Sequence, residues 1–296
     1  MRAVRVRVPA TSANLGPAFD SAALALTLYD EVVVGLGEEE VPGGVRVDVV
    51  GEGETELPRD ARHVVVSSAL SVWQRLGLPM PRLDVSCVNA IPQSRGLGSS
   101  AGAICAGLMA GRALADATGE LDDATLLAMA VEIEGHPDNV AACLRGGVTL
   151  AWSPTEVVSI PPHPDLAAVA FVPDARSSTA ASRGLLPESV PHRDAAANAA
   201  RAALLSLALS ADLDLLLPAT QDFLHQDYRA PSMLPSSELV SALRADGVAA
   251  VISGAGPTVL ALGSRADSSG VAGRAPSGWR ALALEIDRQG AVVTPA

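Results

Sequence analysis

Residues 91–102 read IPQSRGLGSSAG, a glycine-rich stretch between an expected strand over 82–89 and an alanine-rich, helix-forming segment over 99–117. Gly96 and Gly98 let the backbone turn sharply and approach a ligand closely. The free N–H groups of the first helical turn, together with the helix dipole, form an anion site. The order strand, glycine loop, helix therefore predicts a phosphate-binding loop. The alternative is a capped helix after a glycine turn, with no ligand.

Composition excludes several classes of protein. The chain has 296 residues, of which 49% are hydrophobic and 18% charged, as expected for one large globular domain or two ordinary ones. Its 33 acidic and 21 basic residues give a net charge of -12, which argues against a nucleic-acid binder and against a polybasic membrane anchor. All 21 basic residues are arginine. Without lysine, the chain cannot carry a Walker A loop, a protein-kinase strand lysine or a lysine Schiff base.

The cysteines and the N-terminus predict a cytoplasmic protein. Cys87, Cys105 and Cys143 are far apart and form no C-x-x-C pair, so a zinc site is not expected and the thiols suit a reducing compartment. The first nine residues alternate Arg and Val like a strand, unlike a signal peptide. No run of about 18 apolar residues predicts a membrane span.

Hydrophobic patterning predicts strands and helices in both halves of the chain. Strands are expected over 4–8, 30–36, 45–50, 82–89, 166–172, 248–252 and 259–262. Helices are expected over 61–76, 99–117, 122–134, shortly after 139, over 195–209 and over 237–245. The polar, Gly/Pro-bearing stretch 9–20 reads as a loop. Three prolines cluster within 155–164, which predicts domains at 1–158 and 159–296.

A second candidate segment is AVEIEGHPDNVAACLRGG, residues 130–147. A carboxylate beside a phosphate loop suits Mg²⁺, which usually takes one or two carboxylates. Glu132 and Glu134 point about 200° apart on a helix, so both cannot reach one ion. Asp138 and Asn139 can orient a substrate hydroxyl, although Asp138 can equally cap the next helix. His136 alone is more often a structural hydrogen-bonding residue than a base.

Three weaker signals remain. SGAGPT at 253–258 can be a hairpin turn, or its glycines can pack against the phosphate loop. Asn14 and Asp20 are short polar residues in a largely apolar stretch, where local turn chemistry is the plain alternative. Arg183 and Arg229 are isolated arginines, and composition alone would leave both on the surface.

Six segments in register over about residues 4–262 resemble the GHMP small-molecule kinases: PATSANLG followed by F-D, IPQSRGLGSSAG, EGHPDNVAACLRGG, RGLLP, HQDYRAP and ISGAGPTVLAL. EGHPDN with HQDYRAP is similar to the homoserine kinases within that superfamily. The resemblance implies an α+β GHMP kinase fold, with an N-terminal ribosomal protein S5 domain 2-like domain and a C-terminal ferredoxin-like domain. It implies phosphorylation of L-homoserine by ATP in threonine biosynthesis. The alternatives are another GHMP kinase, acting on mevalonate or a sugar, and a nucleotide-binding homologue with weakened catalysis.

The resemblance also implies roles for individual residues. It implies that the nucleotide is contacted by Pro92, Arg95, Gly96, Leu97, Gly98, Ser99, Ser100, Ala101, Gly254 and Gly256. By the same resemblance, Mg²⁺ would be bound by Ser100 together with either Glu132 or Glu134. The substrate and catalytic set comprises Asn14, Asp20, His136, Asp138, Asn139, Thr179, Arg183 and Arg229. In that set the two arginines would hold the homoserine carboxylate and Asp20 or Asp138 its ammonium. Asn14, His136 and Asn139 would orient the hydroxyl.

Two positions depart from the family pattern. Ala18 stands where the family usually has glycine, and Ala181 lacks a second hydroxyl. Because no lysine can assist a general base, the expected chemistry is weak base assistance or direct transfer to the hydroxyl. A homodimer is the candidate assembly, and no nucleic-acid or membrane partner is expected.

Overall fold

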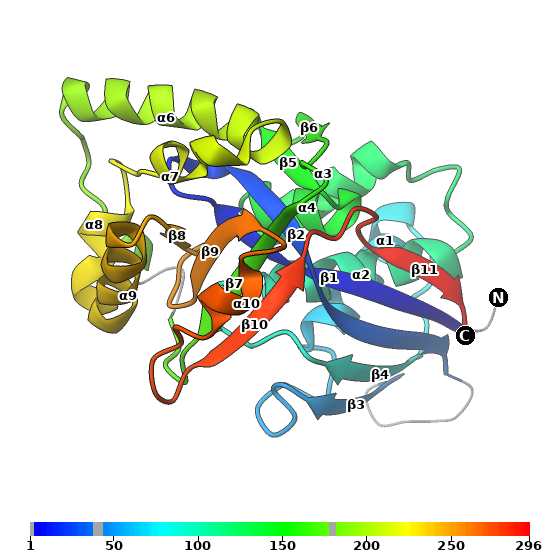
Figure 1. The fold of residues 1–296 in the computed structure, drawn as a ribbon. Helices are drawn as coiled ribbons and strands as arrows, with labels where there is room; N and C mark the ends of the chain where they lie inside the picture. Colours follow the sequence, from blue (N-terminus) through cyan, green and yellow to red (C-terminus); the bar gives the residue numbers. More distant parts are fainter. Residues whose placement is uncertain (1–2, 38–43, 178–181) are drawn as a thin grey trace.

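Two β-sheets covered by helices form the fold in the computed structural model, which describes residues 3–37, 44–177 and 182–296 (Figure 1). The strands of the first sheet are β1 (Ala3–Asn14), β2 (Ala18–Leu36), β3 (Val45–Gly51), β4 (Leu83–Asn89), β5 (Val148–Ala151), β6 (Val157–Ile160) and β11 (Val292–Pro295). Their order is β11-β1-β2-β4-β3, with β5 paired to β2 and β6 to β5. Among the strand pairs of the described residues, only β3 and β4 run parallel, and the crossover between them contains a helix, as is usual for parallel neighbours.

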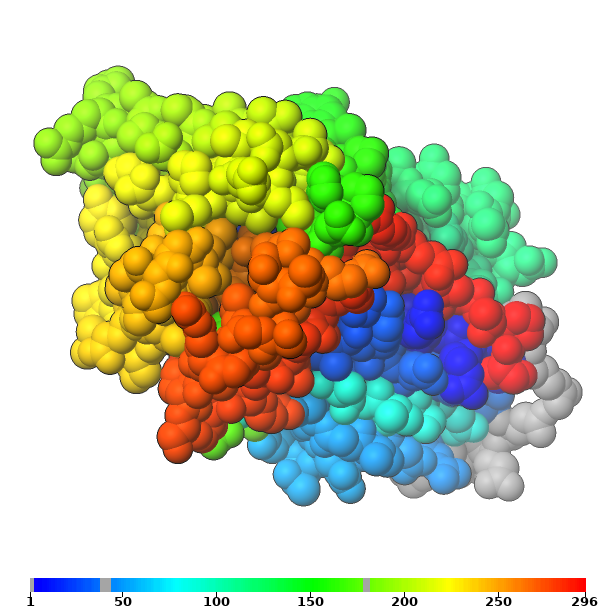
Figure 2. Space-filling view, viewed as in Figure 1, coloured from blue at the N-terminus to red at the C-terminus, as the bar shows by residue number. Residues whose placement is uncertain are grey.

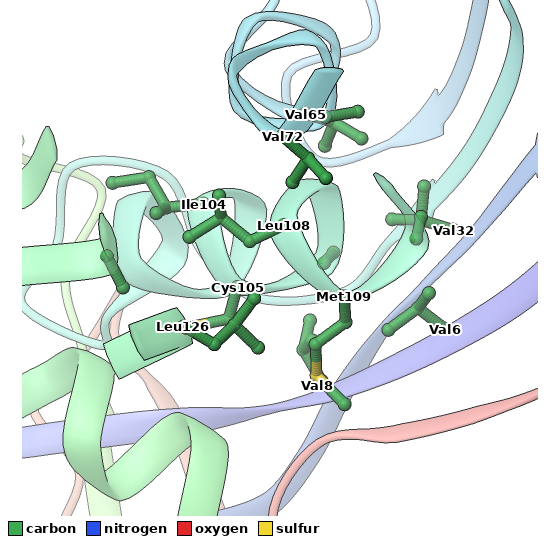
Figure 3. Packing of buried hydrophobic residues seen from close by; sticks show 14 of the residues in the cluster. Val6, Val8, Val32, Val65, Val72, Ile104, Cys105, Leu108, Met109 and Leu126 are labelled. Carbon is green, nitrogen blue, oxygen red and sulfur yellow. The ribbon is translucent and has the colours of Figure 1, made fainter. Parts of the chain in front are cut away.

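The helices described in this first half are α1 (Val64–Leu76), α2 (Ser99–Leu114), α3 (Asp123–Glu134) and α4 (Asp138–Arg145). The Asp122 carboxylate caps α3 by accepting from the Thr125 N–H, and Gly77 ends α1 in the left-handed conformation. Helix α2 is the most buried, enclosed by α1 and by valines of the sheet (Figure 3). A Cβ on Gly107 would lie 2.3 Å from the Val65 carbonyl oxygen, so this glycine allows α1 and α2 to pack closely.

The second sheet comprises β7 (Leu166–Val172), β8 (Ala249–Ile252), β9 (Val259–Ser264) and β10 (Arg280–Glu285). All its pairs are antiparallel, and the order β10-β7-β9-β8 is that of a ferredoxin-like unit. The accompanying helices are α6 (His192–Ser210), α7 (Leu216–Ala219), α8 (Gln226–Arg229), α9 (Leu234–Ala245) and α10 (Ser268–Ala272), with 3-10 turns at Leu213–Leu215 and Ala230–Ser232. The predicted α+β class is confirmed.

Both ends of the chain contribute to the first sheet. After the second sheet is complete, the chain returns and β11 pairs antiparallel with β1, from Val4 opposite Pro295 to Arg7 opposite Val292. Figure 2 shows this last segment, in red, beside the blue N-terminal strands. Residue 158 itself lies within β6. The division into 1–158 and 159–296 stays a prediction about domains.

The prediction of a loop over 9–20 was wrong for most of its length. Strand β1 continues to Asn14 and β2 begins at Ala18, leaving only a three-residue turn. Cross-strand pairs such as Thr11 with Ala25 satisfy backbone groups that the local composition assigned to a loop. Strands β5, β6, β10 and β11 were not predicted. Within the described residues, no helix is long and apolar enough to cross a membrane.

Candidate active site

Three turns from distant parts of the chain meet at a cleft. They are the glycine loop before α2, the turn between β1 and β2, and the glycine turn between β8 and β9. The predicted site residues that line the cleft are Asn14, Asp20, Arg95, Gly96, Gly98, Ser99, Ser100, Glu134, His136, Asp138, Asn139, Arg183, Arg229, Gly254 and Gly256. Pro92, Leu97 and Ala101 are buried beneath it, and Thr179 lies outside the described residues.

The two glycine turns are packed against each other. A Cβ on Gly96, whose φ is +77°, would lie 2.2 Å from the Ser253 carbonyl oxygen. The Gly254 N–H donates to the Ala13 carbonyl at 3.1 Å, and the Asn14 side-chain amide donates to the Gly254 carbonyl at 2.9 Å. The segment 253–258 is thus a hairpin turn and also the backing of the predicted phosphate loop. The Asn14 carbonyl oxygen Oδ1 in turn accepts from the Asp20 backbone N–H at 2.9 Å.

The arginine of the predicted phosphate loop, Arg95, has structural contacts. Arg95 donates through its guanidinium to the backbone carbonyls of Gln93, Pro173 and Asp174 at 2.8–3.0 Å. These bonds tie the loop to the end of β7. Helix α2 begins after Gly98, and its first residues, Ser99 and Ser100, line the cleft. This arrangement offers an anion the backbone donors and dipole of a helix terminus.

One of the two candidate glutamates reaches the loop. The Ser100 hydroxyl donates to Glu134 Oε2 at 2.7 Å, whereas Glu132 is exposed and does not line the cleft. Burial raises the pKa of Glu134, with the Ser100 hydrogen bond opposing that shift. The hydroxyl and carboxylate are oxygen ligands of the kind that Mg²⁺ prefers. Within the described ranges, no cluster of three or more His, Cys, Asp or Glu side chains that could hold a metal ion is present.

The segment after α3 holds a buried acid. Asp138, 3% exposed, accepts from the Asn139 backbone N–H at 2.6 Å and faces the Asn139 side-chain nitrogen at 3.3 Å. His136 Nδ1 lies 3.3 Å from Asp138 Oδ1, and this carboxylate raises the pKa of His136. His136 Nδ1 forms no hydrogen bond among the described residues, so its contact with Asp138 is a charge contact. His136, Asp138 and Asn139 therefore form one polar wall of the cleft.

Opposite charges face each other on the other side. Arg183 forms a two-pronged ion pair with Asp20, at 2.8 Å and 2.6 Å. Arg229 is 2% exposed, and its Nε donates to the Ser182 carbonyl at 3.2 Å. Both guanidinium groups lie over the Phe19 ring, at 5.5 Å and 5.1 Å from its centroid. Composition had left both arginines on the surface, but the fold brings them to the cleft.

Arg229 is the less compensated of the two cations. Among the ion pairs of the described residues, none involves Arg229, whose NH1 instead lies 3.3 Å from His225 Nδ1. Burial, and next the nearby Arg183, lower the pKa of Arg229, while burial also lowers the pKa of His225. Asp20 and Asp222 oppose this shift without forming a direct ion pair with Arg229. Because a buried cation is costly unless it is paired, this position is suited to receive a further anion.

The comparisons with known proteins agree with this geometry. The family models "GHMP kinases N terminal domain" and "GHMP kinases C terminal" match residues 63–147 and 192–281. Homoserine kinase of Streptomyces avermitilis is 54% identical over 99% of this chain and 96% of its own length. The solved homoserine kinase of Cytophaga hutchinsonii superposes with a TM-score of 0.87 at 28% identity, covering 99% of this chain and 98% of that one. The chain belongs to the homoserine kinase family of the GHMP kinases.

The departures from the homoserine kinase pattern can now be located. Ala18 is the first residue of β2, 4% exposed and packed in the core, and it is not among the residues with positive φ. The backbone there does not require glycine, so this departure gives no support to weakened catalysis. Ala181 lies outside the described residues.

Sequence reasoning missed a second cavity, which also borders the predicted phosphate loop. Ser99 and Ser100 line both spaces. The other walls come from separate segments: Val8, Asp30, Val32, Leu57, Pro58, His63, Val64, Val65, Cys87, Asn89, Gln93 and Ala103. His63 is 3% exposed, and neither of its ring nitrogens has a hydrogen-bond partner among the described residues. Burial lowers the pKa of His63, which favours the neutral ring.

Proposed function

We propose that the chain transfers a phosphoryl group from ATP to the side-chain hydroxyl of L-homoserine. The observation that carries this proposal is the cluster of Arg229, Arg183 and Asp20 next to a phosphate loop. Homoserine is a zwitterion, with a carboxylate for the arginines and an ammonium for an aspartate. A sugar has neither charge, and mevalonate has no ammonium. The high identity to homoserine kinases over nearly the whole chain supports the same substrate.

In this proposal the two cavities divide the nucleotide between them. The triphosphate lies at the glycine loop and the start of α2, and the base enters the mostly apolar cavity beyond Ser99 and Ser100. An apolar pocket with a few polar groups is typical of a cofactor site. The unpartnered ring of His63 supplies such a group for a nitrogen of the base.

Ser100 and Glu134 would hold Mg²⁺, which supplies charge neutralisation at the phosphates when bound. Phosphoryl transfer asks the protein mainly for positioning and electrostatic stabilisation. Residues of the chain meet this requirement. The two arginines and Asp20 orient homoserine, and Asn14, Asn139 and His136 face its hydroxyl. The absence of lysine leaves direct transfer, or weak base assistance from the Asp138 and His136 wall.

An ADP-release screen tests the function. L-homoserine, mevalonate, galactose and L-threonine would each be supplied with ATP and Mg²⁺, and the product identified by ³¹P NMR. Homoserine should give the highest turnover and a phosphomonoester product. Release of ADP without dependence on any of the four would favour a homologue with weakened catalysis. A higher rate with mevalonate or galactose would identify another GHMP kinase.

The base pocket leads to its own prediction. His63→Leu should weaken the binding of ADP about three- to tenfold, the usual value of one neutral hydrogen bond, and leave the KM for homoserine unchanged. Calorimetry with ADP measures the first quantity and steady-state kinetics the second. His192→Leu, at the exposed start of α6, is the matched control. If both variants bind ADP like the parent chain, the base lies elsewhere.

A further inference from the structure

A buried hydroxyl lies one layer behind the polar wall of the cleft. Thr11, in β1, is 0% exposed, and its Oγ1 donates to Asn139 Oδ1 at 2.8 Å. Its backbone N–H donates to the Leu97 carbonyl at 3.0 Å, next to the phosphate loop. Asn139 faces the cleft while Thr11 sits behind it. Thr11 therefore reaches a substrate only through Asn139.

The neighbouring groups determine how the Asn139 amide is turned. Asp138 Oδ1, a carboxylate oxygen, lies 3.3 Å from Asn139 Nδ2 and can only accept from it. The amide must therefore present its NH₂ group to Asp138 and its oxygen to Thr11, whose hydroxyl must donate. With Oδ1 engaged by Thr11, Asn139 has a free N–H to offer the cleft and acts there as a donor.

The phosphate loop leaves space for this hydroxyl. A Cβ on Gly98 would lie 1.9 Å from Thr11 Oγ1. Glycine at 98 thus serves two purposes: its φ of +72° starts α2, and its missing side chain makes room for the Thr11–Asn139 bond. Thr11 therefore fixes the distance between the phosphate loop and the side-chain amide of Asn139.

We infer that Thr11 is a positioning residue that fixes the Asn139 amide as a hydrogen-bond donor to the oxygen of the substrate hydroxyl. The inference rests on the proposed function, because it assumes that Asn139 faces an accepting hydroxyl. Losing the Thr11 hydroxyl leaves the Asn139 oxygen without its donor and frees the amide to rotate. The hydroxyl oxygen is then less well aligned with the phosphoryl group, so turnover falls more than nucleotide affinity does.

Comparing Thr11→Val with Thr11→Ser distinguishes a role of the Thr11 hydroxyl from a general effect of the substitution on folding. Thr11→Val should lower kcat about five- to hundredfold, the range expected when a buried polar group loses its partner. Thr11→Ser keeps the hydroxyl and should retain most of the activity. Calorimetry should give an unchanged Kd for ADP in both. Thr149→Val makes the same replacement at a buried strand threonine whose hydroxyl has no partner among the described residues, and it should have normal kcat.

A double-mutant cycle decides whether Thr11 acts through Asn139. In an Asn139→Ala background, Thr11→Val should cost little more, so the two effects should not add. Multiplicative effects on kcat, or normal kcat in Thr11→Val, would overturn the inference. If Thr11→Val fails to fold, Thr11→Ala replaces it with the same expectation. The cycle uses whichever of the four screened substrates is turned over fastest, so a failed homoserine assignment remains distinct from a failed role for Thr11.

Discussion

Arg229→Ala is expected to lower kcat/KM for L-homoserine by about 30-fold to several thousand-fold, with ATP affinity nearly unchanged. Removing one partner of a buried, hydrogen-bonded charge pair costs about 2–5 kcal/mol. Arg229 meets the conditions for such a loss: it is 2% exposed and is held by the Ser182 carbonyl and the Phe19 ring. Arginine offers a planar fork that grips a carboxylate through two hydrogen bonds.

Arg183→Ala should have a smaller effect than Arg229→Ala. The Arg183 side chain is 37% exposed and already paired with Asp20. A carboxylate that binds Arg183 competes with that aspartate, and a zwitterion offsets the competition by bringing its own ammonium to Asp20. The free energy gained when the substrate carboxylate binds Arg183 is therefore reduced by the cost of breaking the Arg183–Asp20 ion pair.

A substrate analogue distinguishes carboxylate binding from a general loss of structure. The parent chain should strongly prefer homoserine to 3-aminopropanol, which lacks the carboxylate, and Arg229→Ala should lose most of that preference. Steady-state kinetics with both substrates, together with Tm and the Kd for ADP, give the comparison. Arg193→Ala, at the exposed start of α6, is the control. Full activity of Arg229→Ala with homoserine would contradict carboxylate binding at Arg229.

The sequence predicted those parts of the site that depend on contiguous residues. The strand, glycine loop and helix around Gly96 and Gly98 follow from local backbone requirements, and the structure has them in the predicted order. For the glycine turn before Thr258 the sequence left two alternatives, a hairpin turn or packing on the predicted phosphate loop, and the structure has both. The choice between Glu132 and Glu134 could not be made, because helical spacing shows that they diverge but not which one faces the loop.

Features formed by long-range pairing were not predictable in the same way. Residues 9–20 contain the prolines, glycine and polar groups of a loop, yet β2 pairs with this segment and makes most of it strand. Strand β11 pairs with β1, which lies near the opposite end of the sequence. The second cavity has no motif, since its walls, from Val8 to Ala103, come from several separate segments. His63 can be recognised as a candidate site residue only once its burial is known.

Glu134→Gln should reduce kcat by about a hundredfold or more, while Glu132→Gln should have little effect. A metal at the transferring phosphoryl group contributes several kcal/mol at the transition state, and each 1.36 kcal/mol is a factor of ten in rate. Glu134 accepts from Ser100 at 2.7 Å at the phosphate loop, whereas Glu132 is exposed on the same helix. The two substitutions are chemically identical and differ only in which face of α3 they occupy.

A binding measurement separates metal coordination from other roles of Glu134. In the parent chain, calorimetry should show tighter ADP binding with Mg²⁺ than with EDTA. Glu134→Gln should lose most of that difference, and Glu132→Gln should keep it. The carboxylate must be ionised to hold a cation, and burial raises the pKa of Glu134. The Mg²⁺ effect in the parent chain should therefore fade on acidification, beginning at a higher pH than for an exposed glutamate. If both variants retain parental Mg²⁺ dependence and turnover, neither glutamate binds the ion.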